Sequence, residues 1–357
     1  MENRQFLHID NLFLCWDEFR KEKQKKRDVL EFERHLEDNI FELHRQLENQ
    51  TYRHGPYITF HIWDPKHRVI SKATVRDRLV HHLIFNELYR IFDPKFIYHS
   101  YASRLDKGTH LAVNNLAIAL RKVSRNNSRN VFALKCDIYK FFYSVSHQKL
   151  LQIIKNKISD KHFLWLIEEV VKSFVVDNFS RERERVTGLP IGNLSSQIFA
   201  NIYLNELDQF IKHRLHARHY FRYADDFIIL SSNKHELINQ CATIQHLLQQ
   251  ELQLSLHPDK VSIRKFGQGI DSLGYIILPH HIVLRNKTKR RMFRKIALAR
   301  NKFEAGQLSQ GSFIQTIQSY LGMLTHCNGH GLEQDLLQLV FDREYFERTG
   351  TAVIPER

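Results

Sequence analysis

The spacing of apolar residues in the first fifty positions is helical. Apolar side chains recur there, mostly every three or four residues, among many charges: Leu30, Phe32, Leu36, Ile40, Leu43 and Leu47. Such spacing places apolar groups on one face of an amphipathic helix. It predicts a helical N-terminal extension over residues 1–50.

The pattern changes after residue 51. Residues 52–73 are richer in β-branched and aromatic types and include Pro56 and Pro65, which is typical of short strands. Helical spacing returns over residues 75–92. We therefore expect short strands followed by a helix in this part of the chain.

Strand and helix patterns alternate in the middle of the chain. An apolar strand runs into Asp137, helices follow over 150–174, and a strand with a turn is expected over 175–190. A further helix, to about residue 218, precedes two strands joined by a tight turn. This order predicts an α+β fold in which an antiparallel sheet carries helices on one face.

Helical spacing dominates again after Lys287. The apolar residues there form three sets, of which the last two have intervals of three or four: Ile296, Leu298 and Phe303, then Phe313, Ile317, Leu321 and Leu324, then Leu332, Leu336 and Val340. Glycines separate these sets, at Gly306, at Gly311 and over 329–331. The pattern predicts a few antiparallel helices joined at the glycines.

The tight turn carries two adjacent acids, Asp225 and Asp226, between aromatic and β-branched strands. Carboxylates are the ligands that Mg²⁺ prefers, and two-ion phosphoryl transfer draws acids from separate segments. Asp137, at the end of a buried strand, is the candidate third acid. The alternatives are a solvated loop for the Asp-Asp turn and a helix N-cap for Asp137.

The amino-acid composition indicates what kind of partner the protein binds. Lysine and arginine number 53 against 39 acids, a net charge of +14, with 22 histidines. Basic residues cluster over 20–27, 121–129 and 287–300. Each cluster can be a solvated face, but three on one basic chain favour contact with RNA or an RNA–DNA duplex.

Other classes of protein fit the sequence less well. No uninterrupted apolar run reaches the roughly 18 residues of a membrane span, and the first residues lack the form of a secretory signal. The four cysteines are widely spaced, which favours reduced core residues over disulfides or zinc ligands. We expect a cytoplasmic protein with no membrane partner.

The motifs, taken in chain order, resemble those of reverse transcriptases between about Asp64 and Tyr275. The segments that carry the resemblance are the finger stretches 68–70 and 76–80, Asp137 with Phe142, the stretches 188–197 and 223–226, His257-Pro258-Asp259-Lys260, and Leu273-Gly274-Tyr275. The resemblance implies a right-hand polymerase fold with fingers, palm and helical thumb. Its expected boundaries are an extension over 1–50, fingers over 51–130, palm with finger elements over 131–284, and thumb over 285–357.

The resemblance also implies roles for individual residues. Catalysis would fall to Asp137, Asp225 and Asp226, which with the carbonyl of Ile138 would bind two Mg²⁺ ions, with Mn²⁺ as a substitute. The residues implied to contact the incoming dNTP are Lys66, Arg68, Arg78, Phe142, Ile191, Gln197 and Lys260. Those implied to contact nucleic acid are Gly274, Lys289, Arg290 and Arg291. Core packing for Phe142 and a plain phosphate contact for Lys260 are the alternatives.

One segment narrows the resemblance. Most reverse transcriptases carry Gln-Gly, three residues and Ser-Pro, whereas here Ile191 replaces the glutamine and Gln197 the proline. This departure resembles the group II intron-like bacterial enzymes of diversity-generating retroelements, as do residues 107–110 and 319–322 with His326 and Asn328. That group implies a bacterial or phage origin, cDNA synthesis that is error-prone at template adenines, and a small basic oligomeric accessory protein.

Two other functions stay open at this stage. The first is a bacterial antiphage defence reverse transcriptase that works with, or is scaffolded by, a noncoding RNA. The second is a catalytically idle RNA-binding scaffold. Retention of all three acids favours an active enzyme.

Overall fold

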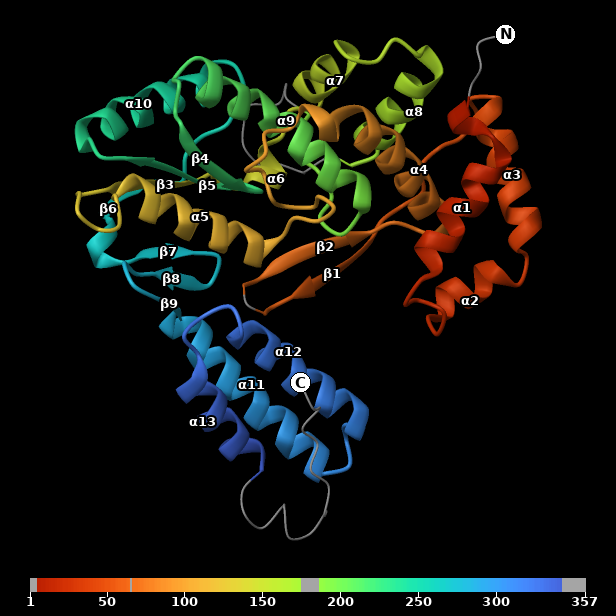
Figure 1. Cartoon of the computed structure of the whole chain (residues 1–357). Helices are drawn as coiled ribbons and strands as arrows, with labels where there is room; N and C mark the ends of the chain where they lie inside the picture. The colour runs from red at the N-terminus through yellow and green to blue at the C-terminus, as the bar shows by residue number, and fades with distance from the viewer. Residues whose placement is uncertain (1–4, 65, 175–185, 342–357) are drawn as a thin grey trace. The chain divides into compact units, whose positions relative to one another are not determined.

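The chain folds into two compact units in a computed structural model, which describes residues 5–64, 66–174 and 186–341 (Figure 1). The first unit comprises Met1–Gly108, Lys135–Ile229 and His235–Ser262. The second comprises Thr109–Leu134, Leu230–Lys234 and Ile263–Arg357. Both units mix segments that are far apart in the sequence, so neither follows from a single cut of the chain.

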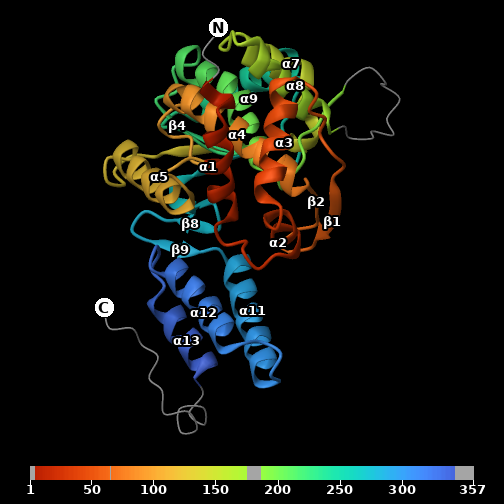
Figure 2. The same ribbon diagram turned by 90° about the vertical axis from the view of Figure 1, so that its right-hand side faces the viewer.

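Helices fill the N-terminal part of the first unit, as predicted. They are the short η1 (Gln5–Leu7), α1 (Ile9–Arg20), α2 (Arg27–Glu33) and α3 (Leu36–Glu48). Figure 2 shows α1 beside α3, and both pairs α1–α3 and α1–α4 are in contact. The predicted helical face is interrupted, because α2 ends before Arg34 and His35 and a separate helix, α3, begins after them. Leu30 consequently leaves the apolar face and is 45% exposed, whereas Ile40, Leu43 and Leu47 are buried.

The short strands predicted after residue 51 are β1 (Ile58–Ile62) and β2 (Arg68–Lys72). They pair antiparallel, with Ile58 opposite Lys72. Helix α4 (Val75–Phe92) follows, and the side chain of Thr74 caps its N-terminus by accepting from the Asp77 amide. The short η2 (Asp93–Lys95) continues from it.

The centre of the chain supplies the remaining helices of the first unit. These are α6 (Phe141–Ser144), α7 (His147–Lys155), α8 (Lys161–Lys172), α9 (Leu194–His213) and α10 (Lys234–Gln250). Helices α4 and α9 pack closely together, and α9 buries most of its length. Most of the strand and turn predicted over 175–190 lies at 175–185, outside the described residues.

A four-stranded sheet has the order β4-β5-β3-β6. Its strands are β3 (Phe132–Asp137), β4 (His219–Tyr223), β5 (Asp226–Ser231) and β6 (Ser262–Lys265). The predicted turn is confirmed: Ala224 and Asp225 alone separate β4 from β5. Strands β5 and β3 are neighbours in this sheet although they come from distant parts of the chain, so Asp137 and the turn acids are brought together by strand pairing.

The second unit contains α5 (Thr109–Val123), the short η3 (Phe266–Gln268) and a three-stranded antiparallel sheet. That sheet is formed by β7 (Ile270–Ser272), β8 (Tyr275–Ile277) and β9 (Ile282–Leu284). The predicted C-terminal helices are α11 (Asn286–Glu304), α12 (Gln310–Leu324) and α13 (His330–Val340), which pack against one another (Figure 1). The α+β fold class is therefore confirmed.

Two of the predicted glycine joints are wrong. Gly311 and Gly331 lie in the first turns of α12 and α13, whereas Gly306 and Gly329 lie between helices. A glycine costs little in a first turn, where amides lack helical partners. Ser309 accepts from the Ser312 amide there and starts α12.

The structure also bears on membrane spans and on the cysteines. None of the described helices combines the length and apolarity needed to cross a membrane. Cys15 and Cys136 are buried and Cys241 and Cys327 are partly exposed, and all four are free thiols.

Candidate active site

The turn between β4 and β5 places Asp225 and Asp226 at one end of the four-stranded sheet. Ala224 adopts a left-handed backbone conformation, with φ of 52°. Residues other than glycine rarely adopt this left-handed conformation, and those that do concentrate at functional turns. The carbonyl oxygen of Ala224 accepts a hydrogen bond from Nη1 of Arg222 at 3.2 Å. Arg222 therefore ties the strained turn to the strand before it.

Arg222 is itself held in a buried ion pair. Its Nε and Nη2 donate to the two carboxylate oxygens of Asp208, on α9, at 2.8 and 2.6 Å. Both side chains have no solvent exposure. The Tyr220 hydroxyl donates to Asp208 at 2.7 Å, and the Asn201 side-chain oxygen accepts from Arg222 at 3.1 Å. Both charges are thus matched by each other and by neutral partners, which is what buried charges require.

Asp137 lies at the end of β3 and is 9% exposed. One of its oxygens pairs with Nζ of Lys260 at 2.8 Å, across 123 residues of sequence. Backbone bonds from the His257 amide to the Asp137 carbonyl and from the Tyr139 amide to Ser255 fasten the segment. The carbonyl of Ile138, between them, takes part in neither bond.

The three acids influence one another electrostatically. Burial raises the pKa of the Asp225 carboxyl; a backbone hydrogen bond opposes the rise, and the charge of Asp137 adds to it. Burial also raises the pKa of Asp226 to about 6; Lys135 opposes this, while Asp137 and Asp225 reinforce it. A side-chain hydrogen bond with Asp137 is among the causes for Asp226. Asp137 therefore acts on the pKa of both turn acids, as expected if the three carboxylates form one group.

These acids have the right chemistry for a hard divalent cation. Crowded carboxylates with raised pKa values are stabilised by a cation that neutralises their repulsion. Across the described ranges, however, no three acid, histidine or cysteine side chains already converge as a metal-binding group. The Lys260 ion pair engages one Asp137 oxygen, so the other oxygen would be the one to ligate a cation while that contact lasts.

The cationic residues predicted to bind the dNTP differ in their contacts and exposure. Arg68, on β2, is close enough to Asp225 to lower its pKa. Lys66 is exposed between β1 and β2. Arg78 instead pairs with Asp28 of α2 at 2.5 Å and lies over the Phe19 ring. That ion pair directs Arg78 towards the N-terminal helices, and its role at the nucleotide stays a prediction.

The segment with the unusual sequence packs on β2. The Ile191 carbonyl accepts from the Ser71 amide at 2.9 Å, and Asn193 both donates to the Ser71 carbonyl and accepts from the Ala73 amide. Gly192 has φ of +119°, and a Cβ there would lie 2.7 Å from Ile70. Only glycine fits this turn. Ile191 is half-buried beside it.

Gln197 and Phe142 flank the same region. Gln197 is exposed on the first turn of α9. Phe142 is half-buried, its ring centre lies 5.4 Å from that of buried Phe141, and its carbonyl accepts from the Leu189 amide at 2.6 Å. The backbone bond joins Phe142 to the segment that carries Ile191.

Comparison with known proteins identifies the family. Residues 63–277 match the family described as reverse transcriptase (RNA-dependent DNA polymerase). That stretch is more than half of the chain and includes all three acids. The chain belongs to the reverse transcriptase family.

Similar proteins include a bacterial protein and a group II intron-encoded one. Protein YkfC of Escherichia coli (strain K12) is 24% identical over 245 residues, which covers 60% of this chain and 64% of that protein. The group II intron-encoded protein LtrA of Lactococcus lactis subsp. cremoris is 27% identical over 178 residues, covering 49% and 28% respectively. This chain spans less than two thirds of either relative. A solved telomerase from Candida albicans has a TM-score of 0.48 at 12% identity, covering 85% of this chain and 62% of that one.

In this reverse transcriptase chain the predicted nucleic-acid contacts lie in the second unit. Lys289, Arg290 and Arg291 occupy the first turns of α11, where Arg290 is exposed and the other two are half-buried. Gly274 turns the chain between β7 and β8 with φ of +94°. Its carbonyl accepts from the Arg285 amide at 3.0 Å. This bond ties the turn at Gly274 to the residue that precedes α11.

Sequence reasoning missed Arg222 and Asp208, which support the turn of this reverse transcriptase. A signal was present in each case. Arg222 interrupts a strand whose other central residues are apolar or aromatic, and Asp208 follows Asn201 by seven residues, on the same face of a helix. Neither signal identifies the partner.

Proposed function

We propose that the protein is an RNA-directed DNA polymerase that copies a dedicated RNA template into cDNA from dNTPs. The observation that carries the proposal is the grouping of Asp137, Asp225 and Asp226 at one end of the four-stranded sheet, inside the family match. The group II intron-encoded relative and the net charge of +14 support a template of RNA.

The three acids and the Ile138 carbonyl would hold two Mg²⁺ ions, for which Mn²⁺ can substitute. Bound there, the ions would lower the pKa of the primer 3′-hydroxyl and stabilise charge on the phosphoryl group. Lys260 holds the Asp137 carboxylate at 2.8 Å. On release from that contact, its Nζ would pair with the leaving pyrophosphate.

The incoming dNTP would lie between these acids and β2. Arg68 would pair with its phosphates, because this cation already acts on Asp225. Lys66 and Arg78 are further triphosphate or template contacts, and Phe142 would exclude a ribose 2′-hydroxyl. Ile191 and Gln197 would shape the pocket. The extension, fingers, palm and thumb would span 1–50, 51–130, 131–284 and 285–357.

The finer proposal is a role in a diversity-generating retroelement, assisted by a small basic accessory protein. It is supported by Ile191 and Gln197, which replace a glutamine and a proline usual in the family. Ile191 offers shape but no side-chain hydrogen bond, so a mismatched pair leaves no buried polar group unpaired. Such a pocket discriminates less between bases.

Polymerase activity is tested by changing one acid at a time. Asp137→Asn and Asp225→Asn should each reduce Mg²⁺-dependent primer extension by roughly 10²–10³-fold or more, because each removes charge needed in the transition state. RNA affinity should survive. Asp106→Asn, at an exposed acid with φ of 56°, is the matched control. Near wild-type extension by either variant would refute the assignment, and a wild-type protein that extends no primer would be an idle scaffold.

Fidelity tests the finer proposal. Wild-type protein should misincorporate most at template adenines, and Ile191→Gln should restore a polar constraint and lower the error rate. The measurement is deep sequencing of cDNA made by both forms on one RNA. Rare errors spread evenly over the four template bases would favour a defence enzyme working with a noncoding RNA.

A further inference from the structure

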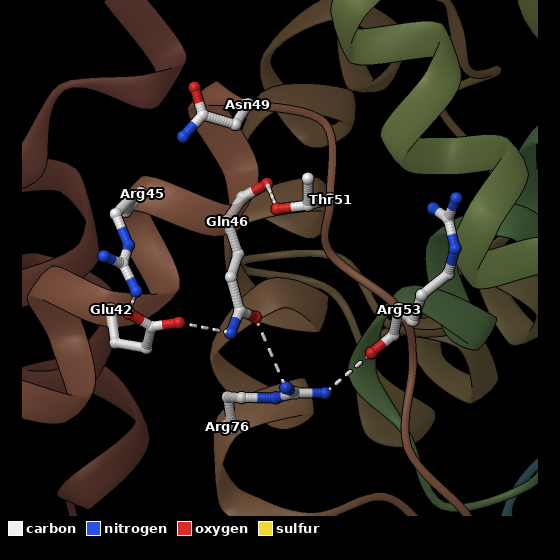
Figure 3. Close-up of a pocket in the computed structure, with 7 residues that line it drawn as sticks. All are labelled: Glu42, Arg45, Gln46, Asn49, Thr51, Arg53 and Arg76. Atoms are coloured by element: carbon white, nitrogen blue, oxygen red, sulfur yellow. Dashed lines mark hydrogen bonds and ion pairs between the residues drawn. The ribbon is translucent and has the colours of Figure 1, made fainter.

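A polar pocket lies in the first unit, away from the elements that carry the three acids. It has a volume of about 510 Å³ and is formed by α3, the segment after it and the first turn of α4 (Figure 3). The described residues that line it are all polar or charged: Glu42, Arg45, Gln46, Asn49, Thr51, Arg53 and Arg76. It carries three guanidinium groups and one carboxylate, and none of them belongs to the basic clusters noted in the sequence.

Arg76 forms a fixed floor for this pocket. It donates to the buried carboxylate of Asp77 through Nε at 3.2 Å and Nη2 at 3.0 Å. It also donates to the Gln46 side chain at 3.4 Å and to the Arg53 carbonyl at 2.7 Å, and it lies over the Tyr52 ring. Because its donors are engaged inside the protein, Arg76 fixes the pocket's shape and is not itself the main ligand contact.

Arg45 and Arg53 differ from Arg76 in lying exposed at the rim. Their side chains are 71% and 68% exposed, and Figure 3 places them on opposite sides of Gln46. Arg45 pairs with Glu42 through Nη2, and Arg53 pairs with Glu169 through Nη1 at 3.3 Å. Exposed ion pairs of this kind are worth only about 0–1 kcal/mol. Each guanidinium has further N–H groups in its fork, so both can take a stronger anionic ligand.

The chemistry of the lining selects phosphate as that ligand. Guanidinium forks match phosphate geometry, and the Asn49 amide adds a neutral donor group beside them, whereas the Thr51 hydroxyl donates to the Gln46 carbonyl at 3.4 Å. A free nucleotide would also need an apolar or aromatic wall for its base, which the described lining residues do not provide. Two exposed arginines on opposite sides suit separate phosphates along one strand.

We propose that this pocket binds the phosphodiester backbone of a single RNA strand, with Arg45 and Arg53 as the phosphate contacts and Glu42 as an internal competitor for Arg45. The inference rests on the proposed function only in taking the strand to be RNA. It adds a binding site on the N-terminal extension that does not overlap the polymerase chemistry.

The test is the affinity for a single-stranded RNA as a function of salt. Removing one phosphate contact should reduce the slope of log affinity against log salt by about 0.7, which over one decade of salt is about fivefold in affinity. Arg45→Gln with Arg53→Gln should therefore bind about 25-fold more weakly at 0.1 M salt and converge with wild type near 1 M. Arg90→Gln is the matched control, because Arg90 is also 71% exposed and pairs with a glutamate three residues earlier.

A second variant should act in the opposite direction. Glu42→Gln frees Arg45 and should tighten RNA binding at 0.1 M salt by up to about fivefold with a steeper slope. A folding defect cannot produce that gain. The KM for dNTPs should stay unchanged in all these variants.

The outcomes separate this inference from the polymerase proposal. Wild-type affinity and slope in the double variant, or a raised KM for dNTPs with unchanged RNA affinity, would overturn the RNA-strand site. If wild-type protein binds RNA but extends no primer, the polymerase proposal fails and the salt dependence still decides the pocket. A wild-type protein that binds no RNA would overturn both.

Discussion

At the scale of single residues, the Asp208–Arg222 pair is the most exacting feature of the site. Two full charges lie in the interior with no solvent exposure, and each is matched by the other and by neutral partners. Removing one partner of such a pair leaves an uncompensated buried charge, whereas removing both charges is often close to neutral. The pair therefore predicts a specific pattern of mutational effects.

Asp208→Asn should lower the free energy of unfolding by about 3–5 kcal/mol, because Arg222 keeps its charge and loses its counter-ion. Urea unfolding followed by circular dichroism measures the change. Combining Asp208→Asn with Arg222→Met should recover part of the loss, since the double variant buries no charge and keeps an acceptor for Tyr220. A double variant less stable than Asp208→Asn alone would contradict this account.

At the scale of secondary-structure elements, the packing of α4 on α9 depends on a buried histidine. His81 is 1% exposed, and its Nδ1 lies 2.6 Å from the Ser195 hydroxyl of α9 while its Nε2 lies 3.2 Å from a nitrogen of His54. Burial lowers the pKa of His81 to about 3; His54, His82 and Arg78 add to this, and Asp77 opposes it. The imidazole is consequently neutral in the folded protein.

This histidine makes stability fall in acid. Between about pH 6.5, the ordinary pKa of histidine, and about pH 3, the unfolded chain binds a proton at His81 that the folded chain does not. Stability from this group is thus complete above pH 6.5 and decreases as the pH falls through that window. His81→Asn places an amide atom at the position of Nδ1 and can still bond to Ser195, and it should reduce the drop in melting temperature between pH 8 and pH 5. Burial also lowers the pKa of His82 and of His99 to about 4, so part of the drop should persist. An unchanged drop would show that other groups cause it.

At the scale of the whole molecule, the net charge of +14 would make electrostatics the main source of affinity for the proposed nucleic-acid partner. The charge alone does not say which basic residues contact phosphate. Those on α11 are candidates because they belong to the basic cluster over 287–300.

Neutralising Lys289, Arg290 and Arg291 to glutamine should weaken binding to an RNA–DNA duplex. The salt slope should fall by roughly 0.9 for each phosphate that the variant no longer binds, because fewer counterions are released. The matched control triple is Lys155, Lys157 and Lys161, three exposed lysines between the end of α7 and the start of α8. Weaker binding with an unchanged slope in the α11 variant would indicate misfolding and not the removal of ionic contacts to phosphate.

Much of the local structure was predictable from the sequence. Helical spacing identified α3 and the C-terminal helices, an apolar run ending in an acid identified β3 with Asp137, and the paired acids identified the β4–β5 turn. Motif order identified the family that the comparison then showed. These features depend on neighbours a few residues apart, whose backbone preferences and periodicity the sequence records directly.

Tertiary structure alone decided which distant groups meet. It paired Asp137 with Lys260, brought Asp137 close enough to raise the pKa of Asp226, and turned Arg78 towards Asp28. It also joined the buried Asp208 to Arg222 and gathered Arg45, Arg53 and Arg76 around one pocket. Such contacts depend on the register of strands and the packing of helices from remote segments. A charged residue has many partners of opposite sign in this chain, and only the packed fold, by burying some and separating others, selects one.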